Sequence, residues 1–424
     1  MISCSSPGPG LFKKKTPHEQ YSKKIEDAGL KETSLGAAWF KAAELTLSTP
    51  LYIQLPYMET GYFAPDKVNS IGLKFIVKRG EKVTIELSKK PDQNFNLYLE
   101  LWKSTIGKSP ELITAADTVS YMITYVAEQD DSLVLRLQSE LLKEGEYTMK
   151  INTGPSLAFP ISPKVKSNIG SYYGAGRDNG QRSHEGIDIF APFRSEAVAI
   201  ADGTISNVGE NKLGGKVIFM RLDHTNYNVY YAHLDTQLVT QGQKVKTGDV
   251  IGLTGKTGNA QFTPSHLHFG IYTFSGAIDP INFVKQDLRS FAKIIAPLTL
   301  IEKPMRTIKA ARIYKTSPPQ IDYKMIPENS LFIPEAVTAN QFRSSFPDGA
   351  IGFVKASDAI PVQKVLTKQT IKVAQTLYSN ADLTSFLKKT LMPGVKVNVL
   401  AFFSNYSYIT TQSGENGWIL KQKS

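Results

Sequence analysis

The chain has 424 residues, of which 41% are hydrophobic, and at about 150 residues per domain this length predicts roughly three domains. Its 49 Lys and Arg residues outnumber its 38 Asp and Glu residues, so the net charge of +11 favours anionic partners. The basic residues are scattered apart from Lys13–Lys15, no nucleic-acid-binding motif occurs, and no apolar run is long enough to cross a bilayer. The sequence therefore excludes a transmembrane helix and argues against a nucleic-acid partner.

Residues 1–15 are predicted to form a flexible tether, which is rich in Gly, Pro and Ser around the single cysteine, Cys4. One cysteine rules out a disulfide within the chain. A cysteine so close to the start of such a tether resembles the acylated cysteine of a bacterial lipoprotein, and we expect a lipid anchor there if a signal segment precedes Met1. The alternative is an incidental free thiol in a cytosolic protein, because the charged and apolar parts of a signal peptide are absent from this sequence.

Residues 16–48 are predicted to form a helical hairpin. Thr16 followed by Pro17 makes a helix start, and the segment SLGAAWFKAAE (34–44) predicts the second helix. Residues 49–160 then alternate between short strands and turns, which is typical of an antiparallel β-sandwich. This segment contains no histidine, so we interpret it as a spacer or a binding domain.

Residues 161–290 have the pattern of a Gly-rich β-domain, so the predicted fold class is mainly β with several domains. Near the start of this domain, RSHEGIDIFAP places His184 and Asp188 four residues apart. Gly186 and its β-branched neighbours oppose a helix, so we place the pair on a loop that enters a strand. An imidazole nitrogen and a carboxylate oxygen are both good Zn²⁺ ligands, and a catalytic zinc site needs a third protein ligand.

Two candidates for the third ligand occur in TPSHLHFGIY, where His266 and His268 flank Leu267. Strict alternation predicts a strand, with both imidazoles on one face and Leu267 pointing toward the core. Either histidine motif alone is more commonly structural than metal-binding. Their occurrence in one Gly-rich β-domain, with His233 of YYAHLD between them, indicates a single site.

Residues 166–284 resemble the lysostaphin/LytM family of zinc endopeptidases, which cut peptidoglycan. The resemblance is carried by HEGIDIFAP, AIADGTI, GGKVIFMRLDH, YYAHLD, VTQGQKVKTGDVIGLTGKTGN and PSHLHFGIY, in the family's order. It implies one Zn²⁺ per chain and two catalytic histidines that do not bind the metal. The implied metal ligands are His184, Asp188 and His268, and the implied catalytic residues are His266 and His233. All five positions hold the expected residue type, which argues against a degenerate, non-enzymatic member.

The resemblance also implies a function, the hydrolysis of peptide cross-links in peptidoglycan, with D-alanyl–diaminopimelate or glycyl–glycine bonds as targets. The lipoprotein-like start favours the former, a D,D-endopeptidase, located in the bacterial cell envelope, periplasmic or associated with the outer membrane. The chain would be cytosolic only if no signal precedes Met1. Two alternatives stay open: a non-catalytic binder or activator of another wall hydrolase, and a zinc protease that acts on a protein or peptide.

The roles of the residues around the zinc ligands are less constrained by the sequence. We favour His266 as the general base, because its strand fixes it next to His268. Asp235, two residues after His233, either orients that histidine or faces solvent. The segment IGSYYGAGRDNGQR (169–182) departs from the shorter Phe-Gly-x-Arg stretch of the family, which leaves substrate positioning unpredicted.

The C-terminal part contains a weak internal repeat, which predicts two modules at 297–362 and 366–424. The segments ARIYKT, MIPENSLFIPEAV and GAIGFVKAS recur as AQTLYSN, LMPGVKVNVLAFF and ENGWILKQ. Both copies end in a glycine, an aromatic residue and an aliphatic residue, at 352–354 and 417–419. They resemble the bacterial SH3-like barrels that accompany wall hydrolases, so we expect two small SH3-like barrels.

Overall fold

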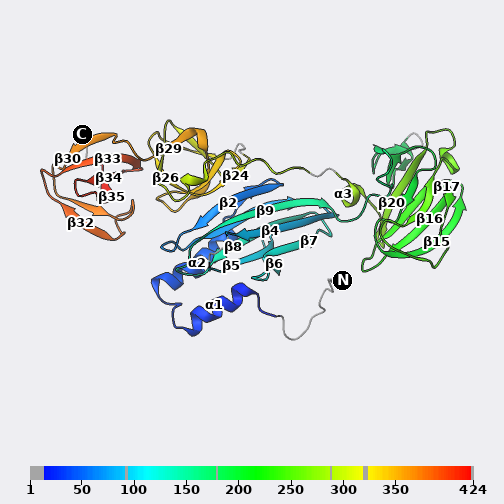
Figure 1. Cartoon of the computed structure of the whole chain (residues 1–424), viewed down its shortest axis with the longest axis horizontal. Helices are drawn as coiled ribbons and strands as arrows, with labels where there is room; N and C mark the ends of the chain where they lie inside the picture. The colour runs from blue at the N-terminus through cyan, green and yellow to red at the C-terminus, as the bar shows by residue number, and fades with distance from the viewer. Residues whose placement is uncertain (1–13, 91–93, 178–179, 287–288, 319–322, 422–424) are drawn as a thin grey trace.

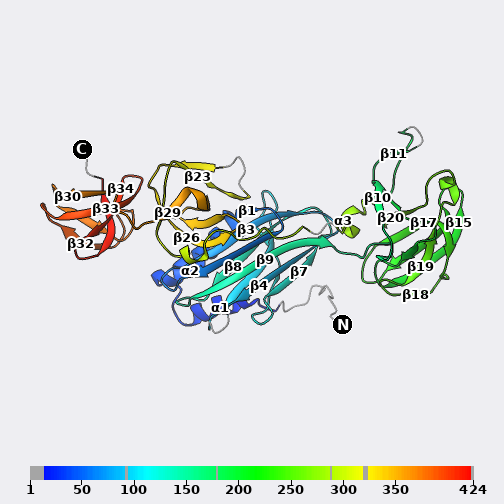
Figure 2. The ribbon, with the colours of Figure 1, turned by 45° about the horizontal axis from the view of Figure 1, so that its top comes forward.

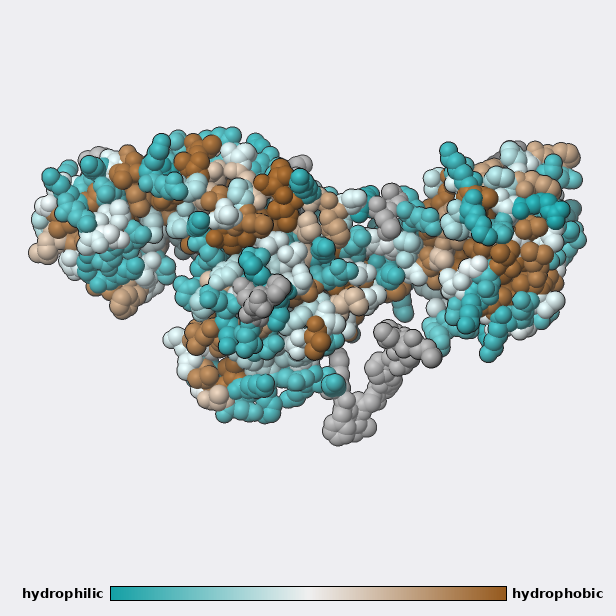
Figure 3. Space-filling view, viewed as in Figure 1, coloured by the Kyte–Doolittle hydropathy of each residue, from teal (hydrophilic) through white to brown (hydrophobic). Residues whose placement is uncertain are grey.

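The computed structural model describes residues 14–90, 94–177, 180–286, 289–318 and 323–421. These residues are mainly β, as the sequence predicts, and they form a sandwich, a separate Gly-rich domain and a C-terminal sheet (Figure 1). The molecule is elongated, and a narrow waist joins the Gly-rich domain to the sandwich (Figure 3). Cys4 lies outside the described residues. No helix in the described part is long and apolar enough to span a membrane.

The two N-terminal helices, α1 (Pro17–Asp27) and α2 (Ser34–Ser48), pack against the sandwich. Thr16 accepts a hydrogen bond from the backbone N–H of Glu19 and donates its own backbone N–H to the Glu19 carboxylate. This capping box confirms the predicted helix start. The buried indole of Trp39 donates to the carbonyl oxygen of Ser139 at 2.9 Å, which anchors α2 to the sandwich.

The sandwich is built from strands that lie on both sides of the Gly-rich domain in the sequence. The N-terminal strands are β1 (Leu51–Ile53), β2 (Tyr57–Phe63), β3 (Ser70–Val77), β4 (Glu81–Lys89), β5 (Leu97–Lys103), β6 (Glu111–Ala115), β7 (Met122–Val126), β8 (Asp131–Ser139) and β9 (Gly145–Pro155). The C-terminal strands are β22 (Met305–Thr307), β23 (Ala311–Tyr314), β24 (Thr316–Ser317), β25 (Tyr323–Ile326), β26 (Leu331–Thr338), β27 (Gln341–Ser345), β28 (Ile351–Lys355) and β29 (Ala359–Pro361). One sheet has the order β24-β1-β3-β8-β5-β6. The other has the order β25-β23-β28-β27-β26-β2-β9-β4-β7, with β22 paired to β26 and β29 paired to β22.

Strand β1 differs from the predicted antiparallel pattern, because it pairs in parallel with both β3 and β24. The intervening strand β2 belongs to the opposite sheet. The chain therefore crosses over and re-enters the first sheet at β3 in the direction of β1, as parallel neighbours require.

The sandwich and the module predicted at 297–362 share both sheets, and the module contributes residues to the core between those sheets in addition to a second hydrophobic cluster of its own. Strand β2 pairs with β26, and the buried cluster between the sheets includes Tyr314 and Phe353. The guanidinium of Arg343 crosses the junction, donating to Glu59 at 3.1 Å and to Glu335 at 2.9 Å, and its side chain is only 2% exposed. These two stretches of sequence therefore form one folded body, into which the Gly-rich domain is inserted.

The last sheet has a hydrophobic core of its own. Its strands are β30 (Thr367–Thr370), β31 (Gln375–Tyr378), β32 (Leu387–Leu391), β33 (Lys396–Phe403), β34 (Tyr406–Thr411) and β35 (Asn416–Leu420), in the order β30-β33-β34-β35-β31-β32. Ile419 of the repeated sequence ending belongs to this core, whereas the buried Trp418 lies in a separate cluster with Leu331 of β26. The likeness of either C-terminal module to SH3 domains stays a prediction.

The Gly-rich domain is one strongly bent sheet with short additional strands (Figure 2). Its elements are β10 (Asn168–Ser171), β11 (Gly176–Arg177), β12 (Arg182–Ser183), β13 (Ile187–Phe190), β14 (Glu196–Val198), β15 (Gly203–Asn211), β16 (Gly215–Leu222), β17 (Asn228–Gln237), β18 (Lys244–Val245), β19 (Val250–Thr254), β20 (His266–Thr273), β21 (Gly276–Ile278) and helix α3 (Ile281–Val284). The central order is β10-β13-β20-β17-β16-β15-β18. Strands β13, β20 and β17 lie side by side, so motifs far apart in the sequence share one region of the sheet.

The Gly-rich domain contacts the sandwich through Phe283 of α3, which is buried. Its ring is edge-on to that of Tyr227, with centroids 5.3 Å apart, and its carbonyl oxygen accepts the N–H of Leu157 at 2.9 Å. Gly80, in the turn before β4, lies so close that a Cβ atom there would be 2.4 Å from the Phe283 ring. This joint therefore requires a residue without a side chain.

Replacing Gly80 with Ala is expected to lower the free energy of unfolding by about 1–3 kcal/mol through overpacking against Phe283. The matched control is Gly107→Ala, because Gly107 also has a positive φ of 74°, compared with 89° at Gly80, but a Cβ there meets nothing within 4 Å. Denaturant unfolding of both variants checks the prediction. Equal losses in the two variants would show that backbone conformation alone, and not the contact with Phe283, sets the cost.

Candidate metal centre and catalytic site

Adjacent elements bring the predicted metal ligands together. His184 lies on the loop after β12, and Asp188 is on β13, which confirms the predicted loop leading into a strand. His268 is on β20, directly opposite Asp188 in the strand register. The predicted strand over His266 and His268 is confirmed as β20, and Leu267 points into the core with no exposed surface.

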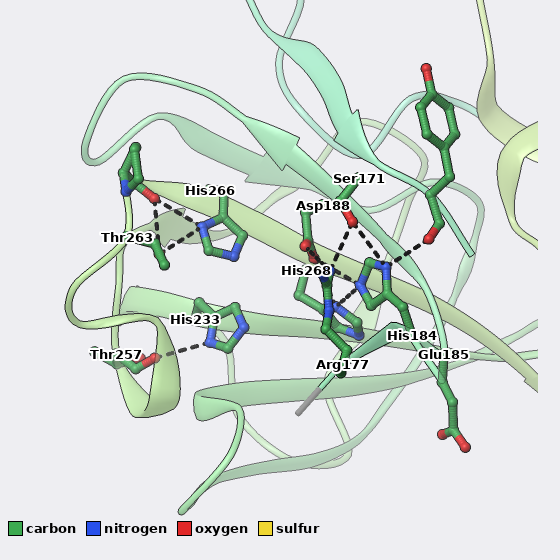
Figure 4. A network of polar contacts seen from close by, with 12 residues as sticks. Ser171, Arg177, His184, Glu185, Asp188, His233, Thr257, Thr263, His266 and His268 are labelled. Carbon is green, nitrogen blue, oxygen red and sulfur yellow. Dashed lines mark hydrogen bonds and ion pairs between the residues drawn. The ribbon is translucent and has the colours of Figure 1, made fainter. Parts of the chain in front are cut away.

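The three candidate ligand atoms form a triangle with equal sides (Figure 4). His184 Nε2, Asp188 Oδ1 and His268 Nδ1 are each 3.0 Å from the other two. A tetrahedral Zn²⁺ with bonds of about 2.0–2.2 Å holds its ligand atoms about 3.3–3.6 Å apart, so the triangle needs only a small expansion. Three atoms with lone pairs that face one another also require a cation or a proton between them. The two nitrogens and one carboxylate oxygen therefore fit zinc.

The surroundings of these side chains favour the unprotonated forms that a metal needs. The Nδ1–H of His184 donates to the carbonyl oxygen of Tyr172 at 2.9 Å, which turns Nε2 toward Asp188. Burial alone would raise the pKa of Asp188, but its hydrogen bonds with His184 and His268 outweigh burial and lower that pKa below its ordinary value. Burial also lowers the pKa of His268.

Two further imidazoles, those of His233 and His266, lie beside the triangle, with their ring centroids 4.9 Å apart (Figure 4). His266 Nδ1 is 2.9 Å from the carbonyl oxygen of Pro264, and His233 Nδ1 is 2.9 Å from that of Thr257. A carbonyl oxygen only accepts, so each Nδ1 carries the hydrogen and each Nε2 is an acceptor when the ring is neutral. Both side chains are thus arranged to take up a proton at Nε2.

A backbone irregularity in β17 turns the His233 side chain toward the candidate metal ligands. Tyr231 and Leu234 both point into the core, whereas simple alternation would place position 233 on the same side as Tyr231. The register with β16 shifts between Tyr231 and Leu234, and His233 has a left-handed backbone with φ of 61°. This bulge turns the imidazole to the face that carries His268.

Burial, followed by repulsion from His266, lowers the pKa of His233 to about 4. His233 is therefore neutral at pH 7. In the neutral ring, with Nδ1–H bonded to Thr257, Nε2 offers a lone pair and no hydrogen.

Sequence patterns did not reveal several of the supporting groups. Asp235 does not orient His233, since its carboxylate pairs with Arg194 at 3.4 Å and the Thr257 carbonyl holds the imidazole instead. Arg177 contacts Asp188, and the sequence offered no signal for this beyond its place in the divergent segment 169–182. Backbone carbonyl groups have no sequence signature, because every residue carries one.

Residues 182–280 match the family model described as Peptidase family M23. The L-Ala–D-Glu endopeptidase of Bacillus subtilis (strain 168) is 30% identical over 175 aligned residues, which cover 37% of this chain and 53% of that protein. The peptidoglycan DD-endopeptidase ShyC of Vibrio cholerae serotype O1 is 30% identical over 170 residues, covering 39% of this chain and 36% of that protein. The murein hydrolase activator NlpD of Salmonella typhimurium is 32% identical over 129 residues, covering 30% of this chain and 31% of that protein.

Among solved structures, the catalytic domain of the antimicrobial peptidase lysostaphin from Staphylococcus simulans is 32% identical, covers 28% of this chain and 92% of that chain, and has a TM-score of 0.25. The chain spans about half of the Bacillus subtilis relative and about a third of the other two curated relatives.

Proposed function

Because residues 182–280 form a domain of peptidase family M23, we propose that this chain is a zinc-dependent endopeptidase that hydrolyses peptide cross-links of bacterial peptidoglycan. The observation that carries the proposal is the 3.0 Å triangle of His184, Asp188 and His268, with two imidazoles beside it whose Nε2 atoms are acceptors. A relative named as a peptidoglycan DD-endopeptidase, together with one named as an L-Ala–D-Glu endopeptidase, supports the substrate class.

His184, Asp188 and His268 would hold the ion, which when bound supplies a Lewis acid that polarises the scissile carbonyl and acidifies water. His266 acts as the general base: its Nε2 takes a proton from the attacking water and passes it to the leaving amine. His233, with a pKa near 4, stays neutral at pH 7 and accepts a hydrogen bond from the same water, which orients it. The low basicity of His233 is the reason to assign proton transfer to His266.

We propose the D-alanyl–diaminopimelate bond as the one cut, a D,D-endopeptidase reaction in the cell envelope, with a lipid anchor at Cys4. The relatives' names refer to different bonds, an L-Ala–D-Glu bond in one and DD-endopeptidase activity in another. They therefore support peptidoglycan as the substrate, and an experiment must determine which bond is cut. The net charge of +11 would help to retain the protein on an anionic envelope, an effect that salt weakens.

Digestion of purified peptidoglycan sacculi, with the products identified by mass spectrometry, tests the proposal. The wild type is expected to release cross-link fragments with a new D-alanyl carboxylate and a new diaminopimelate amine, and Asp188→Ala is expected to release none. Asp223→Ala is the matched control, because Asp223 is an exposed carboxylate of the same domain.

A wild type that contains about one zinc per chain yet releases no fragments would refute the wall-hydrolase proposal. Two further assays then separate the alternatives: cleavage of an unfolded protein substrate would indicate a general zinc protease, and stimulation of a second wall hydrolase would indicate an activator. Full activity of Asp188→Ala would refute the metal assignment.

A further inference from the structure

The two carboxylate oxygens of Asp188 have different partners. Oδ1 faces His184 and His268 at 3.0 Å, whereas Oδ2 accepts a hydrogen bond from Arg177 Nη2 at 2.6 Å (Figure 4). The same Nη2 donates to Ser171 Oγ at 2.8 Å. The Arg177 side chain is 32% exposed and that of Asp188 only 11%, so this ion pair is partly shielded from solvent. An exposed pair would contribute little, but a shielded pair on a ligand carboxylate affects how that ligand is presented.

Arg177 and His184 lie on the two arms of the β11–β12 hairpin, so the pairing of these arms fixes the two residues relative to each other. Arg177 lies opposite Arg182, and the pairing continues beyond the strands, where His184 N–H donates to the carbonyl oxygen of Ala175 at 2.9 Å. The Gly174 N–H donates in turn to the carbonyl oxygen of His184 at 2.9 Å. The position of Arg177 is therefore fixed relative to His184, and it reaches across to Asp188 on β13.

We propose that Arg177 is a positioning residue that reserves Oδ2 of Asp188 and so makes this carboxylate a one-oxygen ligand. The inference rests on the proposed zinc site. A carboxylate can bind a metal through one oxygen or through both, and a catalytic zinc site uses three protein ligand atoms and keeps a position open for water and substrate. Arginine is always charged and donates in a rigid geometry, so it would keep Oδ2 engaged and leave only Oδ1 for a bound ion. The open position would then depend on Arg177 although Arg177 is not a ligand.

Arg177→Met removes the guanidinium and keeps an unbranched side chain. Cobalt(II), which absorbs visible light more strongly in a four-coordinate than in a five-coordinate site, serves as the metal probe in place of zinc. We expect Arg177→Met to bind about one Co²⁺ per chain, because all three ligands remain, but with weaker visible absorption. We expect peptidoglycan turnover of the zinc form to fall by about 10–100-fold. Arg177→Lys, which can still donate to Oδ2, is expected to recover part of both signals.

Arg182→Gln is the matched control, because it removes one positive charge from the same hairpin at the position opposite Arg177. It is expected to keep the absorption and the turnover of the wild type. Wild-type absorption and turnover in Arg177→Met would overturn the proposal. Loss of the metal in Arg177→Met, or a melting temperature of its apo form below that of Arg182→Gln, would also overturn it, since Arg177 would then build the site instead of reserving one oxygen.

The cobalt spectra separate this inference from the proposed function. If the wild type binds Co²⁺ but releases no peptidoglycan fragments, the proposed function fails, and the difference in absorption between the wild type and Arg177→Met still decides the role of Arg177. A wild type that binds no Co²⁺ would overturn both proposals.

Discussion

His268→Ala is expected to lose both the metal and the hydrolysis of peptidoglycan, whereas His266→Ala is expected to keep about one zinc per chain and lose about 10²–10⁴-fold in turnover. The two histidines are two residues apart on β20, but only His268 Nδ1 belongs to the 3.0 Å triangle with His184 and Asp188. His266 Nδ1 is bonded to the carbonyl oxygen of Pro264, so its Nε2 is the atom available for proton transfer. Zinc content measured by atomic emission, together with turnover on sacculi, checks both halves of this prediction.

His224→Ala is the control for these two variants, because His224 is an exposed histidine of the same domain in the turn before β17. It is expected to keep both the zinc and the turnover. Equally low zinc contents in His266→Ala and His268→Ala would contradict the division of roles between the two residues. Normal turnover in His266→Ala would remove its assignment as the general base.

Arg343→Leu is expected to destabilise the folded body formed by the sandwich and the first C-terminal module by about 3–5 kcal/mol, because it leaves two buried carboxylates without their cation. The carboxylates are those of Glu59, with no exposed side-chain surface, and Glu335, with 5%. They come from sequence segments on opposite sides of the inserted domain, so losing the cation strains the junction between those segments. Denaturant unfolding followed by tryptophan fluorescence measures the loss, since Trp39 and Trp102 both lie in this body.

Arg312→Leu provides the comparison, because Arg312 is an exposed arginine of the same module and its loss is expected to cost about 1 kcal/mol or less. Adding Glu59→Gln and Glu335→Gln to Arg343→Leu is expected to restore part of the stability, because the buried charges are removed together. If Arg343→Leu costs no more than Arg312→Leu, the buried ion pairs do not hold the two segments together.

The sequence by itself determined those features that depend on near neighbours along the chain. The capping box at Thr16 and Glu19 marks the start of α1, since a cap is a contact between residues three apart. The alternation of His266, Leu267 and His268 predicts a strand with a buried Leu267, since successive side chains of a strand point to opposite faces. The residue types of the five candidate site positions were also readable, because their motifs follow the order of a known family.

The tertiary structure decided what depends on the pairing of distant segments. Whether His266 or His268 faces His184 is set by the register of β13 against β20, which no local pattern contains. A bulge in β17 determines the direction of the His233 side chain, which strict alternation would have placed in the core. Arg177 reaches Asp188 of β13 because the β11–β12 hairpin fixes its position beside His184, and no local sequence pattern predicts this contact.

The sequence also did not predict that the sandwich and the first C-terminal module share their sheets. No local pattern indicates which strand pairs with β26. In the structure β26 pairs with β2, and this pairing joins residues on opposite sides of the inserted domain. Backbone hydrogen bonds between strands are the same for every sequence, so the choice of partner is made by the packing of side chains such as Arg343 against Glu59. Local patterns therefore predicted many of the elements, the family resemblance indicated the candidate site residues, and long-range packing determined which of them meet.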